Sequence, residues 1–293
     1  MINSKKNFAI YLPSYNAART LPGVLDRIPA NLKQSAKYLL VVDNCSSDDT
    51  EKTVLEYKER HGLNNLHILR VPKNLGYGGS QKIAYRFCLE NLVDVVAMVH
   101  ADGQYAPEVL DDLMTSIFSD KADLTFGSRI KGNPLKGGMP IHRFLGNRAL
   151  TTLQNLFLGS RLSEFHSGYR IFSADSLRRV AFENLSDDYH FDTEMIILYL
   201  REKLRIEEKV IPTHYGDEEN YVNIWKYGVQ VLVTTGTYCL HRWGLRRSRN
   251  WARILAGVDQ SREQFLLDLQ KDARFDGHQA KAPLSVLSAQ NFE

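Results

Sequence analysis

The chain has 293 residues, of which 43% are hydrophobic and 24% charged, a composition typical of a folded globule with a sizeable core. This length fits one large α/β domain with a tail, or two modest domains. A formal net charge of +3 is too small to argue for nucleic-acid binding by itself, and we expect no nucleic-acid partner. Three widely spaced cysteines favour a reducing compartment over a disulfide framework.

Apolar stretches long enough for a membrane are missing from the sequence. None approaches the roughly 20 residues that a spanning helix needs, and the candidate at 227–240 is interrupted by polar residues and glycine. The apolar run after the N-terminus ends at Pro13, which is too early for a secretory signal. We therefore expect a cytoplasmic protein that is soluble or peripheral on the inner face of a membrane.

Short apolar runs alternate with helix-length segments in the first half of the chain. Strands are predicted at 8–12, 38–42, 66–71 and 95–99, and helices at 48–62 and 106–118. The first of these helices carries acids early, bases late and Gly62 as its stop. This alternation predicts right-handed crossovers and a mostly parallel sheet with helices on both faces, an α/β fold.

Polar clusters follow three of these strands directly: "PSYN" (13–16), "DNCSSDDT" (43–50) and "HADGQ" (100–104). Each cluster alone would be a turn or a helix cap. Because the carboxyl ends of parallel strands meet at one edge of a sheet, the three together predict a ligand site there.

Six motifs occur in a recognisable order: "LPSYNAARTLPGVL", "VVDNCSSDDT", "NLGYGGSQKIAYRF", "MVHADGQY", "FGSRI" and "SGYRIF". In combination they resemble family 2 glycosyltransferases, and most of all the branch of dolichol-phosphate mannose synthases and other polyprenyl-phosphate sugar transferases. The resemblance covers about residues 7 to 235. It implies a GT-A fold with a Rossmann-like nucleotide-binding sheet, a nucleotide-sugar donor, a divalent cation (Mn²⁺ or Mg²⁺) and inversion at the anomeric carbon.

The donor-binding residues implied by the resemblance are Pro13, Tyr15, Asn16, Asp43, Asn74, Gly76, Gly79, Ala101, Asp102 and Gln104. Of these, Pro13, Tyr15 and Asp43 match positions that hold the base and ribose, and the glycine loop passes near the nucleotide. A glycine backbone can approach a ligand closely, although a simple strand-to-helix turn would look the same. Lys82 could reach a phosphate, but a solvated helix lysine is the simpler expectation.

"HADGQ" matches the segment with which the family holds the cation that bridges the donor phosphates, so His100, Asp102 and Gln104 are the predicted metal-site residues. Their side chains share one side if the backbone stays extended, and oxygen ligands suit a hard cation. His100 departs from the usual carboxylate. As a metal ligand, an imidazole favours manganese over magnesium. Alternatively, His100 hydrogen-bonds a sugar or a phosphate. For Asp102, the alternative to a metal ligand is a helix cap.

On the acceptor side, the resemblance implies that Arg129 and Arg143 face the phosphates or the acceptor, which guanidinium groups bind in bidentate fashion. Arg129 is also a predicted catalytic residue, because it could neutralise the leaving group, whereas a surface arginine is the alternative for Arg143. Asp192 lies near the start of an apolar helix at 190–200, close to where inverting relatives carry a catalytic base; a helix-capping acid remains the alternative. Residues 211–223, with His214, depart from the mannose-synthase pattern, which leaves the donor sugar and the acceptor open.

Two stretches of the sequence suggest that the protein contacts a membrane surface. Residues 142–159 are strongly apolar, and residues 238–255 mix Trp243 and Trp251 with five arginines, as interfacial segments do. A packed core helix, a dimer interface or a nucleic-acid site are the alternatives. We predict a GT-A domain at 1–235, a basic aromatic helical extension at 236–272 and a poorly ordered tail at 273–293; the sequence does not indicate an oligomeric state.

The function predicted from the sequence is an inverting glycosyltransferase that moves a sugar from a nucleoside-diphosphate sugar to a polyprenyl phosphate at the cytoplasmic membrane face. Two alternatives remain at this stage. The same fold could glycosylate a soluble or glycan hydroxyl, or it could bind nucleotide sugars without catalysis.

Overall fold

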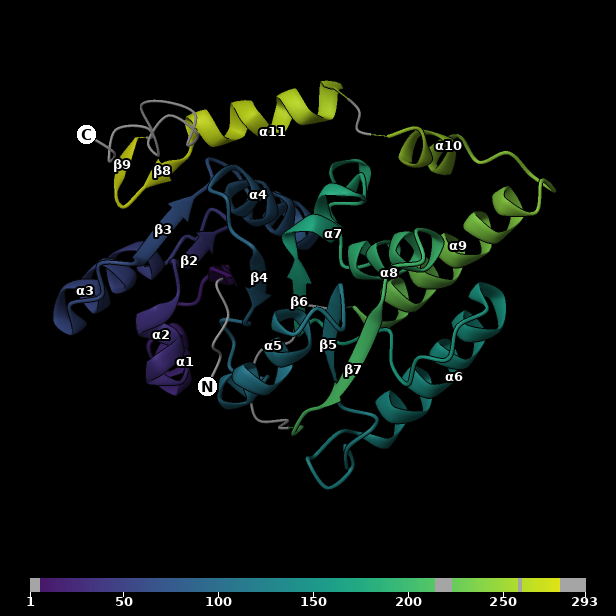
Figure 1. Ribbon diagram of the computed structural model, residues 1–293, viewed down its shortest axis with the longest axis horizontal. Helices are drawn as coiled ribbons and strands as arrows, with labels where there is room; N and C mark the ends of the chain where they lie inside the picture. The colour runs from purple at the N-terminus through teal and green to yellow at the C-terminus, as the bar shows by residue number, and fades with distance from the viewer. Residues whose placement is uncertain (1–5, 214–222, 258–259, 280–293) are drawn as a thin grey trace.

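The computed structural model describes residues 6–213, 223–257 and 260–279. Within these ranges a nine-stranded sheet runs in the order β7-β5-β6-β4-β1-β2-β3-β8-β9 (Figure 1). Its strands are β1 (Phe8–Ser14), β2 (Tyr38–Asp43), β3 (Leu66–Arg70), β4 (Val95–Met98), β5 (Leu124–Ser128), β6 (Arg170–Ser173), β7 (Ile206–Val210), β8 (Arg274–Phe275) and β9 (His278–Gln279). The four strands predicted from the sequence are all present.

The centre of the sheet is parallel and its margins are mixed. Strands β3, β2, β1 and β4 pair in parallel, which confirms the predicted crossovers. Strand β6 then pairs antiparallel with both β4 and β5, while β5 and β7 are parallel to each other. Parallel strands with helices on both faces are buried on both sides, which explains why β1, β2 and β4 are mostly continuous apolar runs without alternation, while β3 includes the partly buried His67 and Arg70.

Helices cover both faces of the sheet (Figure 1). They are α1 (Leu21–Arg27), α2 (Ala30–Ser35), α3 (Thr50–His61), α4 (Gly76–Glu90), α5 (Leu110–Phe118), α6 (Ile141–Leu158), α7 (Ala174–Arg178), α8 (Phe191–Arg201), α9 (Ile224–Arg242), α10 (Arg249–Leu255) and α11 (Gln260–Asp272). Short 3₁₀ turns lie at Pro107–Val109 and Phe182–Asn184. Gly62 ends α3 with a φ of +61°, a left-handed conformation that glycine adopts without strain.

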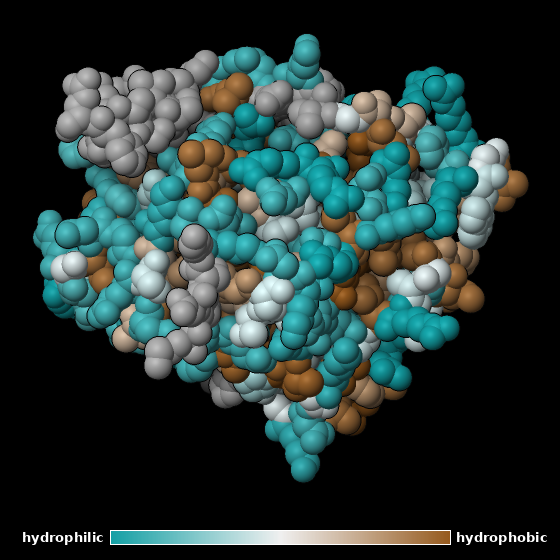
Figure 2. All heavy atoms as spheres, in the orientation of Figure 1, coloured by the Kyte–Doolittle hydropathy of each residue, from teal (hydrophilic) through white to brown (hydrophobic). Residues whose placement is uncertain are grey.

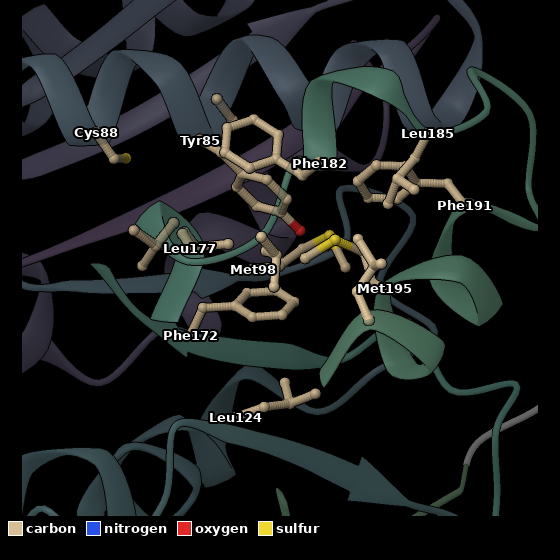
Figure 3. Close-up of a cluster of buried hydrophobic side chains, with 14 of the residues drawn as sticks. Tyr85, Cys88, Met98, Leu124, Phe172, Leu177, Phe182, Leu185, Phe191 and Met195 are labelled. Carbon is tan, nitrogen blue, oxygen red and sulfur yellow. The ribbon is translucent and has the colours of Figure 1, made fainter. Parts of the chain in front are cut away.

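Two hydrophobic cores lie on opposite faces of the sheet, and alternate residues of β1 enter each. Tyr11 packs into one core and Ile10 into the other. Figure 3 shows part of the first core, where Tyr85 of α4 meets Phe172 of β6 and Phe191 of α8. These contacts fix α4 and α8 against the sheet, and the first turns of both helices belong to the site described below.

The C-terminal part of the chain packs onto the domain. Helix α9 runs without a break through residue 235, where the sequence predicts a boundary. Strands β8 and β9, in the predicted tail, form a hairpin that pairs antiparallel with β3. Asp276 secures this hairpin by accepting hydrogen bonds from Ile68 N and Lys58 Nζ. Residues 280–293 lie outside the described part.

The sequence suggests that Trp251 belongs to an exposed aromatic surface, but in the structure its side chain is buried. It is 1% exposed and packs on Tyr238 of α9, because α10 folds back onto α9. Trp243 is exposed, as expected. Among the described residues, no helix is long and apolar enough to cross a membrane.

Candidate active site

A cleft of about 1130 Å³ opens at the carboxyl ends of the parallel strands. The three polar loops predicted to meet there do meet: the cleft is lined by residues 13–17, by Asn44, Ser47 and Asp48, and by residues 100–102, Gln104 and Tyr105. The other walls come from the start of α4, the cleft-facing sides of α6 and α9, the segment before β6, and residues 187–192 before and at the start of α8. A cleft of this size and position suits a nucleotide-sized ligand.

Tyr15 and Asn16 follow β1 and line the cleft as predicted, together with Pro13. Asn16 adopts a φ of +51°, and its side-chain oxygen accepts hydrogen bonds from Ser47 N and Ser47 Oγ at 2.8 and 3.2 Å. This contact ties the loop after β1 to the loop after β2. Tyr15 is 43% exposed, so its ring is free to cover a flat ligand.

Asp43 does not line the cleft, contrary to the prediction that it holds the base or ribose. Its side chain is fully buried. One carboxylate oxygen accepts from Ser46 N and Ser46 Oγ, and the other accepts from Arg70 Nη1 at 3.1 Å. Burial of a carboxylate requires such partners. Its neighbours Asn44 and Ser47 face the cleft instead.

The glycines at the start of α4 serve helix packing as well as the ligand. Asn74 and Gly76 line the cleft. A Cβ at Gly78 would lie 2.4 Å from Ser186 O, and one at Gly79 would lie 2.7 Å from Leu75 Cβ. Gly79 is absent from the cleft wall, so its predicted ligand contact is replaced by close packing of α4 against the loop before α8.

Lys82 is neither a phosphate ligand nor a solvated helix lysine. Its side chain is fully buried, and Nζ donates to Leu185 O and to Asp187, the latter at 2.7 Å. The sequence could not show this, because the partners lie about 100 residues further along the chain. Lys82 thereby fixes the loop that carries Asp187 into the cleft.

His100, Ala101, Asp102 and Gln104 all line the cleft, but not on the extended backbone that the sequence suggests. The chain turns at 101–103, with Gly103 at a φ of +77°, and Asp102 Oδ1 accepts from Gln104 N at 3.0 Å. His100 packs against Tyr105, with ring centroids 4.8 Å apart. Among the described residues, no group of three or more His, Cys, Asp or Glu side chains could hold a metal alone.

Asp192 begins α8 at the floor of the cleft and is 6% exposed. Its carboxylate accepts from the Tyr77 hydroxyl at 3.0 Å and from Gln81 Nε2 at 3.4 Å. Arg170 Nη1 lies 3.8 Å from the same carboxylate and donates to Asp192 O at 2.8 Å. Asp192 therefore does more than cap a helix: it is held in a hydrogen-bonded network that faces the cleft.

Arg129 lines the cleft, but its charge is already paired. Its side chain donates twice to the buried Glu164, and Arg129 N donates to the same carboxylate at 2.8 Å. Burial alone would raise the pKa of Glu164, but the nearby Arg129 charge and its hydrogen bonds hold it below its usual value. Arg143 of α6 also lines the cleft, whereas His214 lies outside the described residues.

Several cleft residues escaped the sequence reasoning. Tyr77 stacks on Tyr189 with ring centroids 5.2 Å apart, and Tyr227 hydrogen-bonds His166. Tyr77 lies within the glycine motif and His166 is the first residue of "HSGYR", so both could have been predicted from the motifs. Tyr227 and Tyr189 gave no sequence signal, because their positions depend on how α8 and α9 pack.

A family model for glycosyl transferase family 2 matches residues 9–181, more than half of the chain. The chain belongs to glycosyl transferase family 2. The resemblance stated from the motifs, the glycosyltransferase class and the GT-A fold are thereby confirmed.

Two named proteins are similar to this chain over most of its length. The low-salt glycan biosynthesis hexosyltransferase Agl6 of Haloferax volcanii is 30% identical over 88% of this chain, which spans 62% of that longer protein. The undecaprenyl-phosphate mannosyltransferase of Micrococcus luteus is 28% identical over 84% of this chain and 98% of its own length.

Among solved structures, the fold is similar to glucosyl-3-phosphoglycerate synthase from Mycobacterium tuberculosis in complex with Mn²⁺, uridine diphosphate and phosphoglyceric acid. The TM-score is 0.57 at 17% identity, over 80% of this chain and 79% of that one. At this identity the similarity concerns the fold alone.

Proposed function

We propose that this glycosyltransferase moves a sugar from a nucleoside-diphosphate sugar to a polyprenyl phosphate, with inversion at the anomeric carbon. In that reaction an oxygen of the acceptor phosphate bonds to the anomeric carbon as the bond to the donor diphosphate breaks, and the nucleoside diphosphate leaves. The relative from Micrococcus luteus is named for transfer to undecaprenyl phosphate, which supports this acceptor class.

The observation that carries the proposal is the composition of the cleft wall. Gly146 and Leu150 of α6 and Ile224 of α9 line the cleft, and both helices continue outward as exposed apolar surface. The exposed residues are Ile141, Leu145, Leu153, Leu156 and Phe157 on α6, and Ile224, Trp225, Val229, Leu232 and Val233 on α9. An acceptor with a phosphate head and a long apolar chain suits this junction.

This apolar surface of α6 and α9 also favours peripheral attachment to a membrane. Figure 2 shows hydrophobic side chains gathered over these two helices on the right of the view. Trp243 and Leu245, just beyond α9, are exposed beside Arg246, Arg247 and Arg249. An apolar face next to an aromatic and basic loop matches the chemistry of an anionic lipid surface.

A divalent cation fits the loop after β4. Asp102 lines the cleft with its carboxylate, and His100 Nε2 is buried without a hydrogen-bond partner in the part of the chain that the structure describes. Together with Gln104 these side chains would hold Mn²⁺ or Mg²⁺, while the donor phosphates complete the ligand set. The cation, when bound, neutralises charge that develops on the departing diphosphate.

The donor would lie along the loops after β1 and β2. Tyr15, Asn16, Asn74 and Gly76 line the cleft, and Tyr15 and Asn16 would contact the base and ribose. Asp43 supports this side from behind through Arg70 and Ser46. We propose Tyr15, Asn16, Asn74 and Gly76 as donor-binding residues. Arg143 would contact the acceptor.

The test is transfer of label from a panel of nucleotide sugars into lipid. The protein is incubated with each labelled donor, Mn²⁺ and a lipid extract, and the products are partitioned. Label that enters the lipid fraction and survives mild base but not mild acid, as expected of a sugar on a polyprenyl phosphate, would support the proposal. Label in a glycan, or no transfer from any donor, would contradict it.

A hydroxyl acceptor is the second candidate, because Asp192 sets a carboxylate at the cleft floor. A hydroxyl needs a base worth about 10²–10⁴-fold in rate, whereas a phosphate is already ionised. For a phosphate acceptor we expect Asp192→Asn to lower kcat by less than about 10-fold at constant donor affinity. A larger loss in kcat would favour the hydroxyl acceptor.

A further inference from the structure

His166 precedes β6 and lines the cleft, and one of its ring nitrogens has no hydrogen-bond partner among the described residues. Its Nδ1 lies 2.9 Å from the Tyr227 hydroxyl, and the two rings meet edge to face at 82°. Its Nε2 is buried and makes no hydrogen bond to any residue that the structure describes, although His166 lines the cleft. A buried polar atom without a partner is uncommon, and at a cleft wall it indicates a missing ligand atom.

The surroundings of His166 keep its ring neutral. Burial lowers the pKa of His166 to about 4, and the charges of Arg129 and Arg170 act in the same direction, while Glu164 opposes them. Arg129 Nη2 also donates to His166 O at 3.0 Å. At neutral pH the imidazole therefore carries one proton, so one nitrogen donates a hydrogen bond and the other accepts.

The Tyr227 hydroxyl decides which nitrogen carries that proton. Burial raises the pKa of Tyr227 well above its usual value, with a further contribution from the charge of Asp192. The hydroxyl therefore keeps its proton and can donate it to Nδ1, an arrangement favoured because an unprotonated imidazole nitrogen is a better acceptor than a phenol oxygen. The remaining proton then lies on Nε2, a buried N–H without an acceptor among the described residues, on a side chain that lines the cleft.

We propose that His166 Nε2–H binds a phosphate oxygen of a substrate and that Tyr227 positions the imidazole for this contact. The inference rests on the proposed function for the identity of the substrates. Either the acceptor phosphate or the donor diphosphate offers the required anionic oxygen. Because Tyr227 belongs to α9, whose exposed face is apolar, the geometry favours the acceptor phosphate. Because the imidazole is neutral, its N–H would add a hydrogen bond to the phosphate without placing a further positive charge beside Arg129.

The first experiment is nuclear magnetic resonance of the full chain labelled with ¹⁵N-histidine. His166→Gln assigns the resonances. We expect Nε2 of His166 to be the protonated nitrogen, and its signal to shift on addition of farnesyl phosphate but not of farnesol. A shift with a nucleoside diphosphate alone would support the phosphate contact and assign it to the donor. A protonated Nδ1, or no shift with either phosphate, would overturn the proposal.

The second experiment measures substrate constants in variants. We expect His166→Phe to raise the KM for farnesyl phosphate about 10-fold or more, and Tyr227→Phe to raise it less. His166→Gln, which retains an N–H donor, should recover part of the loss. His61→Phe is the matched control, because His61 stacks on Tyr57 at the end of α3, outside the cleft wall. Unchanged KM values for both substrates in folded His166→Phe would refute the contact.

Failure of this inference is distinguishable from failure of the proposed function. If the wild-type protein transfers no sugar to any polyprenyl phosphate, the proposed acceptor is wrong, and the Nε2 shift with phosphate ligands still reports on His166. If transfer occurs and neither the shift nor the KM responds to His166, only the contact is wrong.

Discussion

At the scale of single residues, Asp102 has the simplest expected consequence. Its carboxylate lies in the cleft and takes one hydrogen bond, from Gln104 N. A cation and the donor diphosphate would each supply part of the other's binding energy. We expect Asp102→Asn to lose the cation-stimulated part of donor binding, measured by calorimetry with and without Mn²⁺. The free energy of unfolding should change by under about 1 kcal/mol.

His100 should set the choice of ion. An imidazole ligand favours Mn²⁺ over Mg²⁺, and a carboxylate removes that preference. His100→Asp should therefore bring the donor affinities in the two ions closer together in the same calorimetric series. Equal donor affinity of the wild-type protein with chelator and with Mn²⁺ would contradict both metal-site predictions.

Glu194 should make stability depend on pH. Burial raises its pKa to about 7, although Ser186 N donates to its carboxylate and Lys82 lies near. Between the unfolded pKa of about 4.3 and this folded value, only the folded state keeps the proton, so the free energy of unfolding falls as pH rises. The loss from this group should reach roughly 2–3 kcal/mol by pH 7.

Glu194→Gln cannot ionise, so the difference in unfolding free energy between the variant and the wild type should grow from about pH 4.5 through pH 7 and level off above about pH 8. Urea denaturation at a series of pH values measures it. Only this difference is informative, because His166, with its lowered pKa, adds a slope of opposite sign between about pH 4 and 6.5. A difference that stays flat across this range would refute the assignment.

The sequence motifs predicted some residues of the cleft but not their interactions. Tyr15 and Asp102 were predictable as cleft residues, because strand ends and motif spacing place them there without knowledge of other contacts. Asp43 and Lys82 were misjudged, since each pairs with a group distant in sequence, whereas Arg129 lines the cleft as predicted and also pairs with Glu164. Motif spacing indicates that a charged residue is near a site, but only packing decides whether its charge is still free for a ligand.

At the scale of elements, the close packing of α4 on the loop before α8 should be sensitive to one methyl group. A Cβ at Gly78 would meet Ser186 O at 2.4 Å and Phe191 Cβ at 2.8 Å. We expect Gly78→Ala to destabilise the protein by about 1–3 kcal/mol through this clash and to weaken donor binding, because Gly76 and Asp187 line the cleft on either side.

The matched control is Gly236→Ala in α9, where a Cβ meets nothing within 4 Å. There alanine should stabilise the helix by about 0.5–1 kcal/mol, since glycine loses more backbone freedom on folding. Chemical denaturation of both variants measures the difference. Equal stability of the two variants would mean that α4 tolerates a side chain at Gly78.

Prediction of the elements succeeded where the pattern was strong. Strands β1, β2 and β4 are mostly apolar runs, because both of their faces are buried, and β3 is apolar apart from His67 and Arg70. Strand β7 ("IEEKV") is only partly buried and contains three charged residues, so no periodic pattern marks it. Strands β8 and β9 have two residues each, too few for any period, and depend on β3 for their partners.

At the scale of the whole molecule, the apolar surface of α6 and α9 should bind lipid vesicles. Leu156 and Trp225 are 76% and 88% exposed. We expect Leu156→Glu combined with Trp225→Glu to lower the affinity for anionic vesicles at least 10-fold. Sedimentation with vesicles of phosphatidylglycerol and phosphatidylcholine measures this, and the wild-type affinity should fall with added salt because the loop after α9 is basic.

Leu92→Glu is the control for this pair. Leu92 is 69% exposed, but it lies before β4, at the opposite edge of the sheet from the cleft. Its replacement should leave vesicle binding unchanged, and all variants should keep the wild-type affinity for nucleoside diphosphate. Equal vesicle binding by the double variant and the wild type would exclude this surface as the attachment site.

The hairpin of β8 and β9 has a consequence for how the protein is made. It pairs with β3, about 205 residues earlier in the chain, and Asp276 bonds Lys58 and Ile68. During synthesis β3 therefore leaves the ribosome long before the strand that covers its edge. An uncovered edge strand can pair with other chains, so the nascent protein must pass through a period in which the outer side of β3 is open to chaperones or to aggregation.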